Sequence, residues 1–311
     1  MNHSCVLQSR NLSHNASLSY KYSNNILALY AILPLFETCV CLYFQEKIMV
    51  YTVNIGQGST DGYTVYPTDV LGKDYYVHSY TDGGSCVIAA IEDGTTISFL
   101  NQGNGFSYGG NYIGWGSTLT ETLNRFETIS VGECAYSSWS SNDITGSRVT
   151  SDKPVMVIAG NIRTSISWGT GDADHIVDQA LPTDVWGTEF ALISTPNRMA
   201  GDIFCLMAQE ANTFVTLSTG TTFTLWSAGD FYDFWADSNT YTYASSTKPV
   251  YVVLYALEWD SAVDLPEGGD PFMIQIVPLD QYSTTPFVMG TIDPYPSGEF
   301  LHALTLSGNI Y

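Results

Sequence analysis

The pentapeptide GFSYG, residues 105–109, matches the G-x-S-x-G motif that presents a nucleophilic serine in many hydrolases. Ser107 would be the nucleophile, and His175 or His302 would act as the general base. The motif requires a buried strand before the serine and a helix after it, but GNYIGWG follows at 110–116. Because glycine destabilises helices, we favour a glycine- and aromatic-rich hairpin loop and keep a serine hydrolase as an alternative.

A second polar group, GDADH at residues 171–175, has the composition of a cation site. It brings together Asp172, Asp174 and His175, and an Asp-x-Asp pattern opens many Ca²⁺ loops. The full EF-hand pattern is absent, which favours a loop whose aspartate caps a short turn at 175–179. We therefore predict no metal and no obligatory cofactor, and leave Ca²⁺ binding at this loop open.

Aromatic residues provide a third kind of candidate chemistry. The stretch YGGNYIGWG, residues 108–116, carries Tyr112 and Trp115 in a glycine-rich context. Tyrosine and tryptophan anchor protein partners and can stack on sugar rings, although they are also common packing residues of hairpins. We take both as candidate ligand contacts.

The charge balance limits the classes of partner. The 311 residues include 31 Asp and Glu but 10 Lys and Arg, for a net charge of −21. Nucleic acids and anionic lipids both require clustered basic residues, so neither is expected to bind this chain. The 13% of charged residues and the 21 tyrosines are typical of an extracellular all-β protein. An acidic surface keeps a protein soluble, and it also suits a cationic partner or Ca²⁺-rich surroundings.

The N-terminal 47 residues differ from the rest of the chain. Their apolar run at 26–36 is too short to span a bilayer but fits a signal-peptide or signal-anchor core, which would place the remainder outside the cytoplasm. A misjoined gene-model segment is the alternative. Beyond it, Cys86, Cys134 and Cys205 allow one disulfide and one spare thiol, with the pairing open.

One phrase occurs twice: PTDVLGKDY at 67–75 returns as PTDVWGTEF at 182–190. We expect Gly72 and Gly187 in these phrases to permit an unusual backbone angle, and the aromatic that follows to enter a core strand. Turns are expected at Gly94 and Asn212, each two residues after a glutamate. Three further pairs of segments repeat: 86–100 with 205–217, ISVGECAY at 129–136 with WSAGDFYD at 226–233, and SDKPVMVIAG at 151–160 with STKPVYVVLYA at 246–256.

The repeated unit contains short strand-like segments and no long amphipathic helix. PVMVIAGN and PVYVVLYAL are apolar on both faces, which predicts central buried strands that begin at Pro154 and Pro249. We predict an all-β fold of tandem β-sandwich-like repeats of about 100–115 residues, with a β-propeller as the alternative. The expected divisions are 1–47, a first repeat at 48–162, a second at 163–269, and a truncated third at 270–311.

These motifs, in this order, resemble the N-terminal domain of IgGFc-binding proteins over roughly residues 50–300. The match is most specific in DITGSRVTSDKPVMVIAGN at 143–161 and DHIVDQALPTDVWGTEFAL at 174–192. The resemblance implies a non-enzymatic β-rich module of mucus-associated and cell-surface proteins; immunoglobulin binding is not encoded by any motif here. Motif residues that we expect to serve structure are Pro154, Asp178, Gln179, Trp186, Gly187, Phe190 and Pro249; for Asp178, Gln179 and Trp186 a ligand surface is the alternative.

We therefore expect an extracellular or cell-surface module that binds glycoproteins or glycans, mucins among them. No nucleic-acid partner is expected, and no membrane partner beyond the N-terminal signal-anchor. A serine hydrolase acting through Ser107 is one alternative, and a structural spacer that separates other domains is another.

Overall fold

The computed structural model describes most of the chain between residues 50 and 282. Side chains are described at 50–54, 59–81, 83–132, 143–166, 173–195, 201–257 and 271–282. The backbone alone is described at 6–9, 17–23, 26–32, 40–43, 49, 55 and 56. Cys134 and His302 lie outside the described residues, and so do most of the residues before 50.

Two small sheets contain the N-terminal strands. β1 (Val6–Ser9) pairs with β4 (Val40–Tyr43). The other sheet has the order β2 (Ser17–Ser23), β3 (Ile26–Ile32), β5 (Met49–Gly56) and β6 (Ser59–Thr64). The apolar run of the sequence thus includes β3, which pairs in parallel with β5. Within the part of the chain that the structure describes, no helix is long and apolar enough to cross a bilayer.

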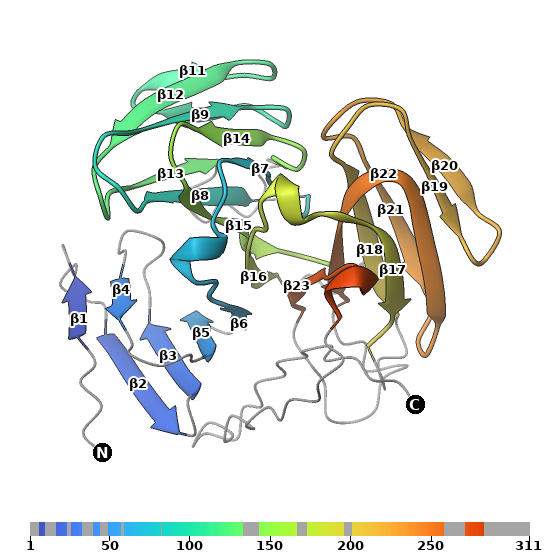
Figure 1. Cartoon of the computed structure of the whole chain (residues 1–311), viewed down its shortest axis with the longest axis horizontal. Coiled ribbons are helices and arrows are strands. Elements are labelled where there is room, and N and C mark those ends of the chain that lie inside the picture. Colours follow the sequence, from blue (N-terminus) through green and yellow to red (C-terminus); the bar gives the residue numbers. More distant parts are fainter. Residues whose placement is uncertain are drawn as a thin grey trace. The chain divides into compact units, whose positions relative to one another are not determined.

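The first of two compact units, residues 1–164 with 175–184, contains a β-sandwich of two four-stranded sheets (Figure 1). Along β9, Ile97 and Phe99 are buried between the sheets while Thr96 and Ser98 are part-exposed. Ile88 and Val157 meet them from the opposite sheet in one apolar core. One sheet has the order β12 (Thr118–Leu123), β9 (Thr95–Leu100), β14 (Arg148–Ser151), β7 (Asp74–Tyr76); the other has β13 (Thr128–Gly132), β8 (Gly84–Ala90), β15 (Val155–Thr164), β16 (Asp174–Gln179).

The second unit, residues 165–174 with 185–311, repeats this arrangement around one long strand. The first half of β22 (Tyr241–Ala256) pairs with β19 and β17, and its second half pairs with β18 and β23. β22 therefore takes the places of both β14 and β15 (Figure 1). The other strands are β17 (Gly187–Ile193), β18 (Asp202–Ala208), β19 (Thr213–Leu217), β20 (Thr222–Leu225), β21 (Phe231–Ala236) and β23 (Met273–Ile276).

The predicted all-β, sandwich-like repeat is confirmed, and the propeller alternative is not observed. The expected central strands are also confirmed: β15 lies between β8 and β16, and the second half of β22 lies between β18 and β23. One detail is wrong. Pro249 does not begin a strand but lies inside β22, where the strand passes from one set of partners to the other. Pro154 directly precedes β15.

The sequence repeat and the sandwich are offset from each other. β16 precedes the second Pro-Thr-Asp phrase, yet it completes a sheet of the first sandwich beside β15. β23 precedes a third related phrase, PLDQY at 278–282, and pairs with β22 in the same way. A short 3₁₀ helix follows the proline of each phrase: η1 (Thr68–Val70), η2 (Thr183–Val185) and η3 (Leu279–Gln281).

The expected role of Gly72 and Gly187 is wrong. Gly72 and Gly187 are both described, and neither has a positive φ. Instead, a Cβ on Gly72 would come closer to the Pro182 side chain than the 3.0 Å that real Cβ atoms keep, and Gly187 is related to Pro278 in the same way. Glycine is required here for close approach, not for an unusual backbone angle.

The two expected turns are confirmed. Gly94 has φ +63° and Asn212 has φ +58°. Thr95 Oγ1 donates to the carbonyl of Glu92 at 2.8 Å, and Thr213 Oγ1 donates to that of Glu210 at 2.7 Å. The lysines of the repeated Lys-Pro pairs donate to the same turns, Lys153 to Asp93 O at 2.5 Å and Lys248 to Ala211 O at 2.6 Å.

Candidate functional site

Ser107 lies in a β-hairpin. It is the middle residue of β10 (Phe106–Tyr108) and pairs with Tyr112 of β11 (Asn111–Ile113). Gly109 and Gly110 connect the strands with φ of +55° and +80°, which is typical of a tight hairpin turn. The expected hairpin is confirmed, and the strand-to-helix elbow that the hydrolase alternative requires is not formed at Ser107.

His175 is a buried residue of β16. Its Nδ1 lies 2.9 Å from the carbonyl oxygen of Asn161, and its backbone N–H donates to Ser59 Oγ at 2.7 Å. Burial lowers the pKa of the imidazole below its ordinary value, so the ring is neutral at pH 7. Burial and these hydrogen bonds make His175 part of the interior of the first unit.

The predicted turn at 175–179 is wrong, because these residues belong to the wholly buried strand β16. Asp174 begins that strand and is 4% exposed, while Asp172 lies outside the described residues. In the described segments, no three His, Cys, Asp or Glu side chains are grouped as a metal site would require. Ca²⁺ binding through Asp172 and Asp174 therefore stays a prediction.

Polar side chains connect β6 to β16. Asp61 accepts from the N–H of Val177 through Oδ2 at 2.8 Å and from that of Gly62 through Oδ1 at 2.7 Å. Gln179 Oε1 accepts from the N–H of Tyr66 at 3.0 Å, and Asp178 Oδ1 accepts from the N–H of Gln179 at 2.8 Å. Asp178 and Gln179 are both buried, so the structure places these motif residues at a strand junction.

Trp186 and Phe190 are buried in the second sandwich. The indole of Trp186 stacks on the ring of Tyr251, with centroids 5.1 Å apart and an interplanar angle of 14°. The hydroxyl of Tyr251 donates to Gln275 Oε1 at 2.6 Å. Phe190 is part of the main apolar cluster. Both rings are thus packed in the interior of the second sandwich.

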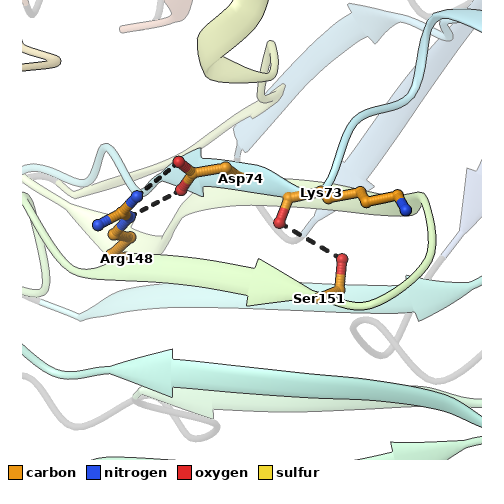
Figure 2. A network of polar contacts seen from close by, with 4 residues as sticks. All are labelled: Lys73, Asp74, Arg148 and Ser151. Carbon is orange, nitrogen blue, oxygen red and sulfur yellow. Dashed lines mark hydrogen bonds and ion pairs between the residues drawn. The ribbon is translucent and has the colours of Figure 1, made fainter.

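Several of the basic side chains that the structure describes are engaged by the protein itself. Figure 2 shows the Arg148 guanidinium facing the Asp74 carboxylate, with Nε–Oδ1 and Nη2–Oδ2 distances of 2.7 and 2.6 Å. Beside this pair, Ser151 Oγ lies 3.5 Å from the carbonyl oxygen of Lys73, whose ammonium donates to Asp152 O at 2.8 Å. Such half-exposed pairs contribute little to stability. They do leave fewer cations on an acidic surface.

Among the described residues of the first sandwich, Tyr112 and Trp115 are the exposed large aromatics, at 73% and 77%. The Tyr112 ring lies so close to Gly105 that a Cβ there would overlap its hydroxyl. Trp115 follows β11 in the turn before β12. The hairpin thus presents two aromatic side chains to solvent.

A larger group of exposed aromatics, which the sequence analysis missed, lies in the second sandwich. Trp226 is 70% exposed and Trp235 is 51% exposed. Tyr232 stacks on Phe223 of β20 with centroids 4.1 Å apart. We call Trp226, Phe231, Tyr232 and Trp235, on and just before β21, the aromatic edge. Three more exposed aromatics lie on β19 and β22: Phe214, Tyr241 and Tyr243.

The aromatic edge was missed because the match of ISVGECAY to WSAGDFYD is wrong in register. Ala90 and Ala208 are equivalent, since they pair with Val155 and Val250 after the two Lys-Pro motifs. Counting back two residues from these alanines gives Ile88 and Leu206 as equivalent positions. Ile88 pairs with Ile129, and Leu206 pairs with Tyr232. Ile129 therefore corresponds to Tyr232 and not to Trp226. Aromatic residues at both odd and even positions of FYDFWA were the available signal, because only one face of the strand packs on the core, through Phe234 and Ala236, and the aromatic residues of the other face are left exposed.

A family model described as IgGFc binding protein matches residues 61–305. A human protein named IgGFc-binding protein is 24% identical over 182 residues, which cover 57% of this chain and 3% of the relative. The chain therefore matches only a small part of that relative's length. No solved structure matches the chain.

Proposed function

Because the chain belongs to the IgGFc binding protein family, we propose that it is a non-enzymatic extracellular module that binds glycoprotein or glycan partners of mucus or matrix. The observation that carries the proposal is the aromatic edge, where four large aromatic side chains on and just before β21 are partly or mostly exposed to solvent. Exposed aromatic clusters of this kind occur at sites of partner binding. The family name directs attention to immunoglobulin Fc as one probe, and the mucus setting directs it to mucin.

The test uses the full chain immobilised on a biosensor, with purified immunoglobulin Fc and purified mucin as the two probes. Each probe is applied before and after removal of its glycans, and with either Ca²⁺ or a chelator. We expect at least one probe to bind, and we expect replacement of the aromatic edge to weaken that binding. A folded chain that binds neither probe in either condition would favour the structural-spacer alternative.

The Ca²⁺ arm tests the loop at 171–175 separately. Loss of binding in the chelator, reproduced by Asp172→Asn, would make this loop part of the binding site. Equal binding with and without Ca²⁺ would remove the loop from the proposal and leave the aromatic edge.

A further inference from the structure

The first sandwich contains an ion pair that is complete within the chain. Arg148 of β14 and Asp74 of β7 lie on neighbouring strands, and the guanidinium donates the two hydrogen bonds to the carboxylate that Figure 2 shows. The same guanidinium lies over the ring of Tyr76, with its central carbon 5.4 Å from the ring centroid. Acid, cation and aromatic ring thus form one contact on the surface of this sheet.

The strand pairing identifies the same positions in the second sandwich. Thr95 and Thr213 begin equivalent strands, because each donates to the carbonyl of the glutamate three residues earlier. From these threonines, the pairing of β9 with β14 and then β7 matches that of β19 with the first half of β22 and then β17. The equivalent pairs of residues are Arg148 and Tyr243, Asp74 and Glu189, and Tyr76 and Ala191.

The second sandwich therefore keeps the acid but not the cation. Among the described residues, Glu189 forms no ion pair, and its Oε1 accepts from the Tyr243 hydroxyl at 2.7 Å. This hydrogen bond raises the pKa of the Tyr243 hydroxyl, so the phenol stays a neutral donor. A carboxylate offers about four acceptor positions on its two oxygens, and Glu189 is exposed, so it can accept further hydrogen bonds. Opposite Tyr243, Ala191 has only a methyl group where the first sandwich has a ring.

The surroundings of Glu189 are aromatic and poor in cations. Tyr241 and Tyr243 are 70% and 42% exposed, and they lie on the same face of β22 because they are two residues apart. The basic residues of the second unit are Arg198, which lies outside the described residues, and Lys248, which lies 3.5 Å from Glu210. An exposed acid beside aromatic rings favours a guanidinium, which combines forked hydrogen bonds with stacking.

We propose that Glu189, with Tyr243 and Tyr241 beside it, binds an arginine side chain of a protein partner. The second sandwich then makes between two proteins the contact that the first sandwich makes within one. The guanidinium donates to the Glu189 carboxylate and stacks on the neighbouring tyrosine, which a lysine ammonium does less well because it lacks the planar fork. The inference goes beyond the proposed function, since this site lies on β17 and β22 and not on the aromatic edge.

The first test measures the fluorescence anisotropy of a labelled peptide that alternates arginine and glycine, added to the full chain. One control peptide has lysine in place of arginine, and another has citrulline, which keeps the shape of arginine without its charge. We expect the arginine peptide to bind, the lysine peptide to bind about threefold more weakly or less, and the citrulline peptide not to bind. Equal binding of the lysine peptide would overturn the preference for a guanidinium, and equal binding of the citrulline peptide would overturn the role of the carboxylate.

Variants place the peptide on the chain. Glu189→Gln removes the charge and keeps the size, and we expect affinity for the arginine peptide to fall about threefold to tenfold. Tyr243→Arg supplies the residue of the first sandwich, so its guanidinium occupies Glu189 and the peptide should lose affinity to a similar extent. The matched control is Tyr112→Arg, which adds the same charge at an exposed tyrosine of the first sandwich and should leave affinity nearly unchanged. Unchanged binding by Glu189→Gln, or equal losses in the two arginine variants, would overturn the assignment to Glu189.

The outcomes separate this inference from the proposed function. If the arginine peptide fails to bind while Fc or mucin binds through the aromatic edge, the inference is wrong and the proposed function stands. If the peptide binds through Glu189 while a folded chain binds neither probe, the inference stands and the proposed function does not. Circular dichroism and the urea midpoint of each variant establish that the chain is folded.

Discussion

Gly72 is packed against Pro182 so closely that a side chain at position 72 would overlap the proline ring, and Gly187 is packed against Pro278 in the same way. In each pair, the glycine of one copy of the repeated phrase receives the proline of the next copy. Asp184 and Asp280 also occupy matching positions, with Oδ1 3.6 and 3.7 Å from the added Cβ. The phrase recurs because its glycine and its proline form the same close contact once in each sandwich.

The close contact between Gly72 and Pro182 predicts that Gly72→Ala destabilises the chain. The added methyl group cannot be accommodated by a flexible side chain, because the neighbour is a proline ring. Overpacking of this kind lowers the free energy of unfolding by about 1–3 kcal/mol. Urea unfolding followed by fluorescence measures the change, and Gly187→Ala should give a similar loss.

A double-mutant cycle tests whether the clash with Pro182 is the cause. Pro182→Gly removes the Cβ that the new methyl group meets, so Gly72→Ala should cost less in that background than in the natural chain. If the two effects simply add, the loss does not arise from this contact.

The turn residues Gly94 and Asn212 should be interchangeable. Both have positive φ values near +60°, a conformation that glycine and asparagine tolerate and β-branched residues do not. Gly94→Asn and Asn212→Gly should change the free energy of unfolding by less than about 1 kcal/mol, whereas Gly94→Val should lower it by about 1–2 kcal/mol. Urea midpoints of the three variants decide the matter; a valine as well tolerated as asparagine would contradict the assigned turn.

His78 should make the chain sensitive to mild acid. Burial lowers the pKa of its imidazole to about 3, from an ordinary value of 6.5. Below pH 6.5 the unfolded chain takes up a proton that the folded chain does not, so stability is lost as the pH falls from 6.5 toward 3. At pH 5 this group alone lowers the free energy of unfolding by about 2 kcal/mol relative to pH 7.

The variant His78→Gln isolates that contribution, since other groups also titrate in this range. We expect the difference in unfolding free energy between pH 7 and pH 5 to be smaller in the variant by about 2 kcal/mol. An unchanged difference would mean that the folded chain protonates His78 as readily as the unfolded chain does.

Features set by neighbouring residues could be predicted from the sequence. The apolar run after Pro154 predicts a central strand, and the Glu-x-Gly and Glu-x-Asn patterns predict the turns at Gly94 and Asn212, because each depends on local backbone preference and hydrophobicity. The glycines of GNYIGWG, which disfavour a helix after Ser107, likewise predicted the hairpin.

Features set by distant residues could not be predicted. His175 and Asp178 are polar and resemble a turn, yet they lie in the buried strand β16. Ser59 and Asp61 of β6 accept from the backbone N–H groups of His175 and Val177, and Ser59 is 116 positions from His175. The constraint on Gly72 comes from Pro182, which a local reading cannot supply. The aromatic edge was not predicted because the two segments were aligned on a glycine and an acidic residue that they share. The strand pairing shows that this alignment of β13 with β21 is wrong.

Cys86 should be chemically silent in the folded chain. It carries a free thiol, lies in the apolar core of the first sandwich, and has a thiol pKa raised by burial. Both the lack of access and the lack of thiolate slow alkylation, since the thiolate is the reactive form. Iodoacetamide at pH 8, followed by peptide mass spectrometry, should leave Cys86 unmodified in buffer and modify it fully in urea. Modification in buffer at the rate seen in urea would mean that this part of the sandwich opens readily. The variant Cys86→Ala gives a second measurement. If the core around Cys86 is packed, removing the thiol lowers the urea midpoint; an unchanged midpoint would agree with a part of the sandwich that opens readily.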